Sequence, residues 1–378
     1  MDLTEIRKGI DAADAKLLEA FLERMRLSET VLEAKRKAGL PILNRERERE
    51  ILARVMRESG ELAPYAHKLY TTLFELSRTY QAALGAKASS LAHSIESGLV
   101  PDGTPLPDRG SVACQGVDGA YSQMAAEKLF PMGTITFFKT FDAVFDAVQS
   151  GLCTYGVLPI ENSTNGSVRN VYTLLKTHSV SIIRSLRLCV THNLLVKPGT
   201  KLSEITEIRS HEQALGQCSA FLKSLRGVKT VPVANTAMAA QSVAESADRG
   251  LACIASSGCA EIYGLEALDV KLQNSDNNYT RFIVITKTPA VYPGANRIAI
   301  ILSLAHKPGS LSEALAKIAS AGINLVKLES YPLVGHDFEF LFFFEIEASV
   351  REAKTLGVLN ELKACSTSFT YLGNYVEG

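Results

Sequence analysis

NNYTRF, residues 277–282, joins a polar loop to an apolar run in this 378-residue chain. Phe282 opens the run FIVI, which is typical of a buried strand. The polar loop therefore delivers Thr280 and Arg281 to the mouth of that strand. A hydroxyl and a cation held at such a place suit an anionic ligand.

A second polar loop of the same kind follows another strand. Residues 159–167, PIENSTNGS, come directly after the strand-like residues 155–158. Ligand sites in open α/β sheets lie beyond the carboxyl ends of strands, so we expect the two loops to form one site. For an isolated Thr-Arg-Phe, the simpler interpretation is a strand start followed by a surface arginine.

Between about residues 111 and 255 strands and helices alternate, which predicts an α/β fold with helices on both faces of its sheet. Thr140 is a good N-cap for a helix that begins at Phe141. Further along we expect a strand at 188–196 and a helix at 214–225. Residues 87–109, rich in proline, glycine and serine, show little periodicity and indicate a linker.

The two polar loops resemble the motifs of the prephenate dehydratase family, and the flanking segments resemble a chorismate mutase domain and an ACT regulatory domain. The resemblance covers nearly the whole chain and implies a multidomain protein. Its expected parts are an all-α three-helix mutase domain that forms an interleaved dimer (1–86), a linker (87–109), an α/β two-lobed dehydratase domain like a periplasmic binding protein (110–290, second lobe about 188–265) and an α+β ferredoxin-like ACT domain (296–378).

Composition narrows the classes of partner. Lys plus Arg and Asp plus Glu number 40 each, so no basic excess favours nucleic acid or an anionic membrane. The expected partners are small molecules and other copies of the chain, as a homodimer or higher homo-oligomer. Seven cysteines form no CxxC pair and seven histidines show no ligand spacing, so we expect no metal and no other cofactor. The absence of a signal-peptide h-region and of a long apolar run predicts a cytoplasmic protein.

Helical periodicity predicts three helices before the linker, at about 3–37, 45–58 and 63–84. Arg24 and Lys35 share an azimuth with apolar residues such as Leu17, so we expect both cations on the inward face of the first helix. Glutamates of the same helix could pair with them, which is the alternative to a bound anion.

The resemblance to the helical mutases assigns roles in the rearrangement of chorismate to prephenate. This pericyclic reaction needs no base, so catalysis rests on holding the reactive shape and stabilising charge on the ether oxygen. The family implies carboxylate contacts from Arg24, Arg7, Arg47 and Ser77, donors to the ether oxygen from Lys35 and Gln81, and ring-hydroxyl contacts from Glu48 and Asn44.

Two of these residues set further expectations. Arg7 lies about 100° around the helix from Arg24, which fits its serving the neighbouring chain's site. Many relatives place an aspartate where this chain has Asn44, so a dehydratase whose mutase domain is kept only for dimerisation stays an alternative.

In the dehydratase reaction prephenate loses a carboxylate as carbon dioxide and its ring hydroxyl as water. A donor to the departing hydroxyl lowers the barrier. The resemblance implies Thr280 as that donor, with a relay through water or Glu161. It implies that the pyruvyl side chain and ring are bound by Arg281, Asn162, Ser163 and Thr164.

Two more segments are expected to line the same cleft. The glycine-rich turn at 116–122 contains Ser122 and opens a helix, and the resemblance implies that it forms a wall of the cleft, with a plain tight turn as the alternative. Residues 210–218, SHEQALGQC, match a family segment that lines the cleft. His211 is expected to bind substrate there, with a helix cap as the alternative.

From residue 296 the pattern reads β-α-β-β-α-β, the ferredoxin-like order. The predicted strands are 297–304, 323–329, 338–347 and 368–375, and the helices are 310–321 and 350–362. The ACT resemblance implies a phenylalanine site made of Gly309, Ser310, Leu311, Asn324, Glu329 and Ser330. Relatives often have arginine where this chain has Tyr331, and a domain used only for dimerisation is the alternative.

Together these patterns predict a bifunctional enzyme of phenylalanine biosynthesis. It would convert chorismate through prephenate to phenylpyruvate and be inhibited by L-phenylalanine. The alternative from another class is a non-catalytic sensor of an aromatic metabolite or amino acid, since a two-lobed binding fold with an ACT domain also suits a sensor.

Overall fold

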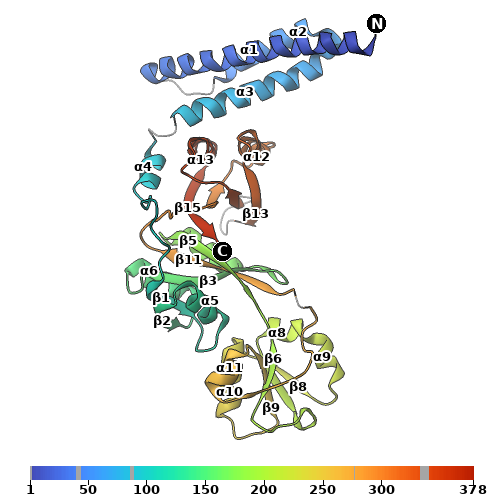
Figure 1. Cartoon of the computed structure of the whole chain (residues 1–378), viewed down its shortest axis with the longest axis vertical. Coiled ribbons are helices and arrows are strands. Elements are labelled where there is room, and N and C mark those ends of the chain that lie inside the picture. Colours follow the sequence, from blue (N-terminus) through green and yellow to red (C-terminus); the bar gives the residue numbers. More distant parts are fainter. Residues whose placement is uncertain (1, 40–43, 86–88, 276, 333–339) are drawn as a thin grey trace. The chain divides into compact units, whose positions relative to one another are not determined.

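The computed structural model describes residues 2–39, 44–85, 89–275, 277–332 and 340–378 (Figure 1). The chain forms two compact units, each built from separate segments. The first unit holds residues Met1–Ser97 and Ile300–Thr370, and the second holds Gly98–Ala299 and Tyr371–Gly378.

The first unit begins with three helices, α1 (Leu3–Ala38), α2 (Arg45–Glu58) and α3 (Ala63–Gly85), with a short 3₁₀ turn at Gly60–Leu62. The predicted helices are confirmed to within one residue. Asn44 caps α2, because its Oδ1 accepts a hydrogen bond from the backbone N–H of Arg47 at 3.1 Å.

The apolar side of α1 is largely exposed within the single chain, which differs from the expected inward face. Leu17 is 55% exposed and Val31 is 44% exposed, whereas Ser28 and Leu32 are buried. Helix α3 packs against α1 and α2, and a single helix covers only a narrow strip of its neighbour. An exposed apolar face of this length suits contact with another chain.

Residues Ser90–Glu96 form helix α4, where a linker was expected. Ser89 caps it by accepting from the N–H of Ala92 at 3.0 Å, and Ala92 and Ile95 are buried. With seven residues the helix is too short for its period to stand out among the flanking prolines and serines. Residues 86–88 lie outside the described part of the chain.

The predicted β-α-β-β-α-β order is confirmed. Its elements are β12 (Arg297–Ser303), α12 (Ser310–Ser320), β13 (Asn324–Pro332), β14 (Phe340–Glu347), α13 (Ala353–Cys365) and β15 (Ser368–Glu377). Residues 338 and 339, predicted to open the third strand, lie outside the described residues. The strand order β13-β14-β12-β15, with β13 antiparallel to β14, is the ferredoxin-like arrangement. Helix α3 packs on α12 and α13 within this first unit.

The second unit has two lobes, each with its own sheet. The sheet of the first lobe has the order β5-β11-β3-β1-β2, built from β1 (Arg109–Gln115), β2 (Met132–Phe138), β3 (Tyr155–Asn162), β5 (Ser181–Cys189) and β11 (Tyr279–Thr286). The short β4 (Gly166–Ser167) pairs with β3. Its helices are α5 (Tyr121–Leu129), α6 (Phe141–Ser150), capped by Thr140 as predicted, and α7 (Arg169–Thr177).

The sheet of the second lobe has the order β10-β6-β9-β7-β8. Its strands are β6 (Asn193–Val196), β7 (Glu207–Ser210), β8 (Lys229–Pro232), β9 (Leu251–Ala255) and β10 (Glu266–Leu268), and its helices are α8 (Glu212–Gln217), α9 (Ser219–Ser224), α10 (Thr236–Glu245) and α11 (Gly258–Tyr263), with a 3₁₀ turn at Leu202–Glu204. Figure 1 shows these helices around the sheet.

The strands of the second lobe are apolar on both sides, which confirms helices on both faces of this sheet. Leu195 and Cys253 join the cluster that contains α10, whereas Leu194 and Ile254 join the cluster that contains Ala214 of α8. Because successive strand residues point to opposite faces, these neighbours divide between the two helix layers.

The strand predicted at 188–196 is wrong as a single element. Residues through Cys189 belong to β5 in the first lobe, and Asn193 starts β6 in the second. The chain crosses between the lobes at residues 190–192 and returns after β10 toward β11. The helix predicted at 214–225 is likewise split into α8 and α9. Among the described residues, the helices are all too short or too polar to span a membrane.

Candidate functional site

The two polar loops meet as expected, at the ends of adjacent antiparallel strands. In the pairing of β11 with β3, Thr280 lies opposite Asn162 and Arg281 lies opposite Glu161. The backbone N–H of Ser163 donates to the carbonyl of Tyr279 at 2.8 Å and continues the pairing. Residues more than 100 positions apart in the sequence therefore form one polar cluster.

The side-chain amide of Asn162 is fully engaged by the protein. Its Oδ1 accepts from the backbone N–H groups of Thr164 and Asn165, both at 3.0 Å, which identifies the other atom as nitrogen. That Nδ2 donates to Oδ1 of Asn278 at 2.9 Å and to Oγ1 of Thr280 at 3.0 Å. Because the Thr280 oxygen accepts from Asn162, its own proton is left to donate to another group.

The chain of hydrogen bonds continues into the second lobe. Since Oδ1 of Asn278 accepts from Asn162, its Nδ2 is the donor to Oε1 of Gln217 at 2.9 Å. His192 lies 2.7 Å from the same Gln217 oxygen, so its Nε2 carries the proton. Burial lowers the pKa of His192, while its hydrogen bond to Gln217 acts in the opposite direction. A neutral imidazole fits this chain.

Four side chains thus connect the crossing between the lobes to the Thr280 hydroxyl, in the order His192, Gln217, Asn278 and Asn162. Three were not predicted as site residues. Gln217 and Asn278 stand in the two motifs that drew attention to His211 and Thr280, and a polar residue that interrupts an apolar run was the available signal for His192.

Arg281 is only 4% exposed and pairs with Glu161, with Nε and Oε1 2.7 Å apart. Successive residues of a strand point to opposite faces of the sheet, so the side chains of Thr280 and Arg281 diverge. That this hydroxyl and this cation meet one ligand stays a prediction, although the two side chains leave β11 on opposite faces. The loop pattern located both residues at the strand end but could not show which face each takes.

Ser163 holds the two loops together through hydrogen bonds to the backbone. Its hydroxyl accepts from the N–H of Tyr279 at 2.9 Å and donates to the carbonyl of Asn277 at 3.2 Å. Thr164 is exposed in the adjoining turn. Asn162 and Ser163 fix the geometry around Thr280, and their contact with substrate stays a prediction.

The turn that leads into α5 lies against the second lobe. Ser256 Oγ donates to the carbonyl of Gly119 at 3.0 Å, and the Tyr263 hydroxyl donates to the carbonyl of Asp118 at 2.8 Å. Gly119 has φ +87°, and a Cβ there would lie 2.6 Å from Cys259 Sγ. Only glycine fits this turn, which places the buried Ser122 close to where the lobes join.

His211 is the N-cap of α8, because its Nδ1 accepts from the N–H of Gln213 at 3.3 Å. Among the described residues, no side-chain hydrogen bond connects His211 with the Thr280 cluster. This location agrees with the alternative that the sequence left open, a capping histidine. The same short helix reaches the cluster through Gln217.

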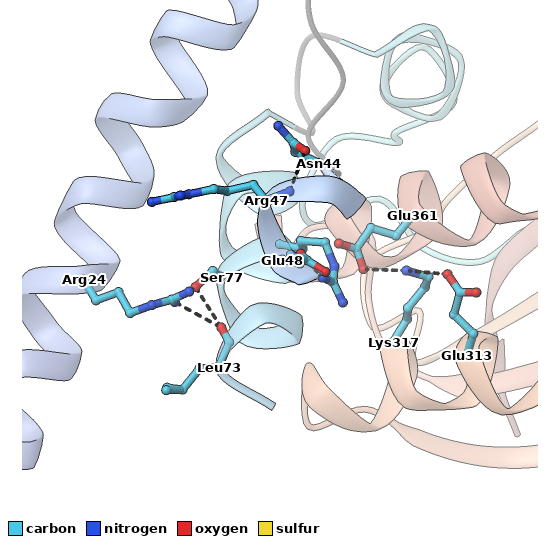
Figure 2. A network of polar contacts seen from close by, with 10 residues as sticks. Arg24, Asn44, Arg47, Glu48, Leu73, Ser77, Glu313, Lys317 and Glu361 are labelled. Carbon is cyan, nitrogen blue, oxygen red and sulfur yellow. Dashed lines mark hydrogen bonds and ion pairs between the residues drawn. The ribbon is translucent and has the colours of Figure 1, made fainter. Parts of the chain in front are cut away.

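The helices of the first unit bring part of the predicted mutase site together (Figure 2). Arg24 donates from Nη1 to Ser77 Oγ and to the carbonyl of Leu73, the latter at 3.2 Å, and its guanidinium lies 5.5 Å from the ring centre of Phe74. Burial lowers the pKa of Arg24, and the negative charge of Glu48 opposes that shift. A guanidinium held in this way is ready for an anionic ligand.

The other predicted mutase residues differ in how deeply they are buried and in which groups they contact. Gln81 is buried and donates to the carbonyl of Ser28 at 2.9 Å, which leaves its second amide hydrogen. Arg47 is exposed and pairs with Glu50 at 2.9 Å. Asn44, expected at the ring hydroxyl, has its oxygen committed to the cap of α2.

Glu48 forms an ion pair with Arg78, a residue that was not predicted to contribute. Lys35 is half-buried toward the end of α1, and Arg7 is exposed in its second turn. Arg7 is therefore open to another molecule rather than part of the cluster in its own chain.

The predicted effector residues divide between two surfaces. Gly309, with φ +88°, precedes α12, and the hydroxyl of Ser310 is buried without a hydrogen-bond partner among the described residues. Asn324 donates to Glu347 at 3.1 Å. Glu329 is half-buried beside Lys327 whereas Ser330 is exposed, so these neighbours lie on opposite faces of β13. Leu311 follows Ser310 in the first turn of α12 and is half-buried.

Comparison with known proteins matches both halves of this arrangement. Residues 6–82 match the chorismate mutase type II family, and residues 112–290 match the prephenate dehydratase family. A bifunctional chorismate mutase/prephenate dehydratase of Enterobacter agglomerans is 30% identical over 99% of this chain and 95% of its own length. Arogenate dehydratase/prephenate dehydratase 2 of Arabidopsis thaliana is 36% identical over 75% of this chain and 77% of its own length.

A solved structure supports the same relationship. The prephenate dehydratase of Arthrobacter aurescens in complex with L-Phe has a TM-score of 0.65 and 26% identity, over 70% of this chain and 89% of that chain. With a helical mutase domain followed by an α/β dehydratase domain, the chain belongs to the bifunctional chorismate mutase/prephenate dehydratase family.

Proposed function

We propose that this chain converts chorismate to prephenate on its helical domain and prephenate to phenylpyruvate in its α/β domain. The family matches of both domains support the two activities. The observation that carries the assignment of the dehydratase site is the Thr280 hydroxyl, whose oxygen accepts from Asn162 and whose proton is therefore available to substrate.

In the dehydratase step Thr280 donates to the ring hydroxyl as the carbon–oxygen bond breaks and water leaves. The electrons of the breaking carbon–carbon bond enter the ring as carbon dioxide departs, so the ring becomes aromatic. A threonine is a weak acid, and a water molecule would return its proton. We assign Glu161 and Arg281 to positioning the two strands, because their pair lies on the other face of the sheet from Thr280.

The test is the pair Thr280→Val and Thr280→Ser, assayed with prephenate and separately with chorismate. Valine keeps the shape of threonine without the hydroxyl, and we expect it to lower the dehydratase kcat about 10²- to 10³-fold. Serine keeps the hydroxyl and should retain most of the rate. Mutase turnover should be unchanged, and an unchanged melting temperature reports that the dehydratase unit of the variant is folded. Full dehydratase activity in a folded Thr280→Val variant would refute the assignment.

For the mutase half we propose an interleaved dimer with shared sites. The exposed apolar face of α1 and the exposed Arg7 support it, since both suit contact with a second copy. Arg24, Lys35, Gln81, Ser77, Arg47, Glu48 and Asn44 would come from one chain, and Arg7 from its partner.

Complementation tests this sharing. Arg7→Ala and Arg24→Ala should each be inactive as mutases. In a mixed dimer, one of the two sites has both arginines intact, so co-refolded mixtures should regain about one quarter of the parent's sites. Two inactive variants that stay inactive when mixed would argue for sites within single chains.

We further propose that the β-α-β-β-α-β domain is an ACT domain that binds L-phenylalanine. The ferredoxin-like topology and the left-handed Gly309 support it, as does the relative crystallised with L-Phe. The Ser310 hydroxyl, buried and without a hydrogen-bond partner in the part of the chain that the structure describes, supports it too. A time course with chorismate, with and without phenylalanine, is the test. Phenylpyruvate formation that falls with phenylalanine supports all three sites, and phenylalanine binding without turnover would instead favour a sensor.

A further inference from the structure

We propose that Arg78 is a positioning residue of the mutase site and that it couples this site to helices α12 and α13. The inference rests on the mutase function proposed above. It adds a residue to which the family resemblance assigns no role.

Helix α3 presents two different faces to the rest of the first unit. Ser77 and Gln81 contact α1 through Arg24 and the carbonyl of Ser28. Because each residue advances about 100° around the helix, Arg78 is turned away from that face. Together with Glu75 and Thr79, Arg78 lines a small pocket against α12 and α13.

On the mutase side Arg78 pairs with Glu48 of α2, the residue expected to hold the ring hydroxyl of chorismate. Both side chains are largely shielded, at 22% and 27% exposed. The guanidinium contacts Oε1, and the described residues show no hydrogen bond to Oε2. Arg78 therefore fixes the direction of the carboxylate and leaves one oxygen for the substrate hydroxyl.

On the other side lie charged residues of α12 and α13 (Figure 2). Lys317 of α12 lies 3.9 Å from Glu361 of α13 and 3.8 Å from Glu313. The Glu361 side chain is only 11% exposed. Burial raises its pKa, and the positive charges of Lys317 and Arg78 oppose that shift. The charge of Arg78 is thus felt by carboxylates of both domains.

The pocket between these helices is small. Its volume of about 30 Å³ has room for a water molecule or two, and Thr79 Oγ1 lies 3.3 Å from Ser320 Oγ at its edge. Glu75, Glu313 and Glu361 line this space with Arg78 and Lys317, and Arg78 also pairs with Glu48. Because Lys317 pairs with Glu361 and the charge of Arg78 acts on Glu361, a change in the Lys317–Glu361 pair changes the field at Arg78.

Helix α12 makes this cluster relevant to regulation. It begins at Ser310, among the proposed effector residues, and carries Lys317 two turns later. A displacement of α12 on effector binding would move Lys317 relative to Glu361, change the pull of Glu361 on Arg78, and so change how firmly Glu48 is held. Effector binding would then reach the mutase through α3.

The test uses the full chain and the variants Arg78→Met and Arg78→Lys. We expect Arg78→Met to raise the KM for chorismate about tenfold with a smaller change in kcat, since Glu48 orients the bound ring. Arg78→Lys restores a cation and should recover much of the loss. Dehydratase kinetics with prephenate, whose site lies in the second unit, should not change.

The coupling is tested with Glu361→Gln. This variant should weaken the response of the mutase to phenylalanine while the inhibition of the dehydratase persists. Glu352→Gln, which removes an exposed carboxylate paired with Lys354, is the matched control and should leave both responses unchanged. The effects of Arg78→Met and Glu361→Gln should not add in the double variant.

The outcomes distinguish a failure of the role proposed for Arg78 from a failure of the proposed mutase function. An active parent whose Arg78→Met variant keeps KM and kcat within about twofold would overturn the positioning role. A Glu361→Gln variant with a normal mutase response to phenylalanine would overturn the coupling. A parent chain without mutase turnover would instead refute the proposed mutase function.

Discussion

The dehydratase and mutase halves of this chain differ in how completely one chain builds the site. Around Thr280 the polar side chains bond to one another, and Arg281 is buried on its carboxylate partner. Around Arg24 the cluster is partial, Arg7 is exposed, and apolar residues of α1 face solvent. The proposed dehydratase site is organised by folding, whereas the proposed mutase site would be completed by association with a second chain.

This difference follows from the architecture of each domain. A two-lobed α/β unit brings residues from distant segments together through strand pairing, which also sets their register. Three helices cannot enclose a site for a small anion, because a long helix packs only a strip of its surface on its neighbours. The dehydratase should therefore tolerate dilution, and the mutase should not.

The strongest challenge to the comparison is Arg281→Met, because it removes a buried cation from the dehydratase unit. Glu161 is 30% exposed, so water solvates part of the charge left behind, and we expect a loss of about 2 kcal/mol in unfolding free energy. Dehydratase activity should fall with it while the mutase survives. Calorimetry of the variant, beside the exposed control Arg226→Met, measures the loss; equal melting of both would contradict the role of the pair.

The association of the mutase half is tested by Leu17→Glu. Leu17 is 55% exposed in the single chain, and a charge there should disrupt the proposed contact with a second copy. We expect mutase activity to fall about 100-fold at low protein concentration with dehydratase turnover intact. Leu152→Glu, at a leucine 69% exposed in the second unit, is the control. Light scattering reports the oligomer, and an unaltered oligomer with full mutase activity would count against the proposed interface.

Asn278→Ala sharpens the claim that the dehydratase site is organised within one chain. Asn278 is 2% exposed and links Asn162 to Gln217, so alanine frees both amides. We expect kcat with prephenate to fall about 10- to 50-fold with little change in KM, because the Thr280 proton loses its direction. Asn278→Asp keeps the acceptor for Asn162, so its kcat should lie between those of the parent and of Asn278→Ala. An unchanged kcat in the alanine variant would show that the chain of amides is not needed.

The smallest effect is expected from His192→Gln, which keeps a donor near the position of Nε2. Because burial lowers the pKa of folded His192 below the unfolded value of 6.5, the unfolded state binds more protons as the pH falls below that value. The unfolding free energy of the parent therefore falls as the pH drops below 6.5. The unfolding free energy of the variant should fall less over the same range. Denaturation at pH 5 and pH 7 measures it, with His67→Gln as the exposed control.

The sequence predicted features that depend on nearby residues better than features that depend on contacts between distant segments. The bounds of α1, α2 and α3 followed from periodicity, and the meeting of Thr280 with Asn162 followed from two loops at strand ends. The opposite directions of Thr280 and Arg281 depend on register, which a loop motif does not contain. The chain of amides through Gln217 depends on how the two lobes pack. Helix α4 is too short to leave a period.

The last residues of β15 have a consequence for how such a protein can be divided or recombined. Val376 pairs in parallel with Arg184 of β5, Glu377 binds both Arg187 and Arg297 at 2.7 Å, and a Cβ at Gly373 would lie 2.2 Å from the carbonyl oxygen of Ile182. A stop codon placed after the dehydratase segment would thus remove an edge of its sheet along with the β-α-β-β-α-β domain. Gene fusion or trimming at this junction has to carry residues 371–378 with the catalytic half, so loss of the β-α-β-β-α-β domain is not a single-step change.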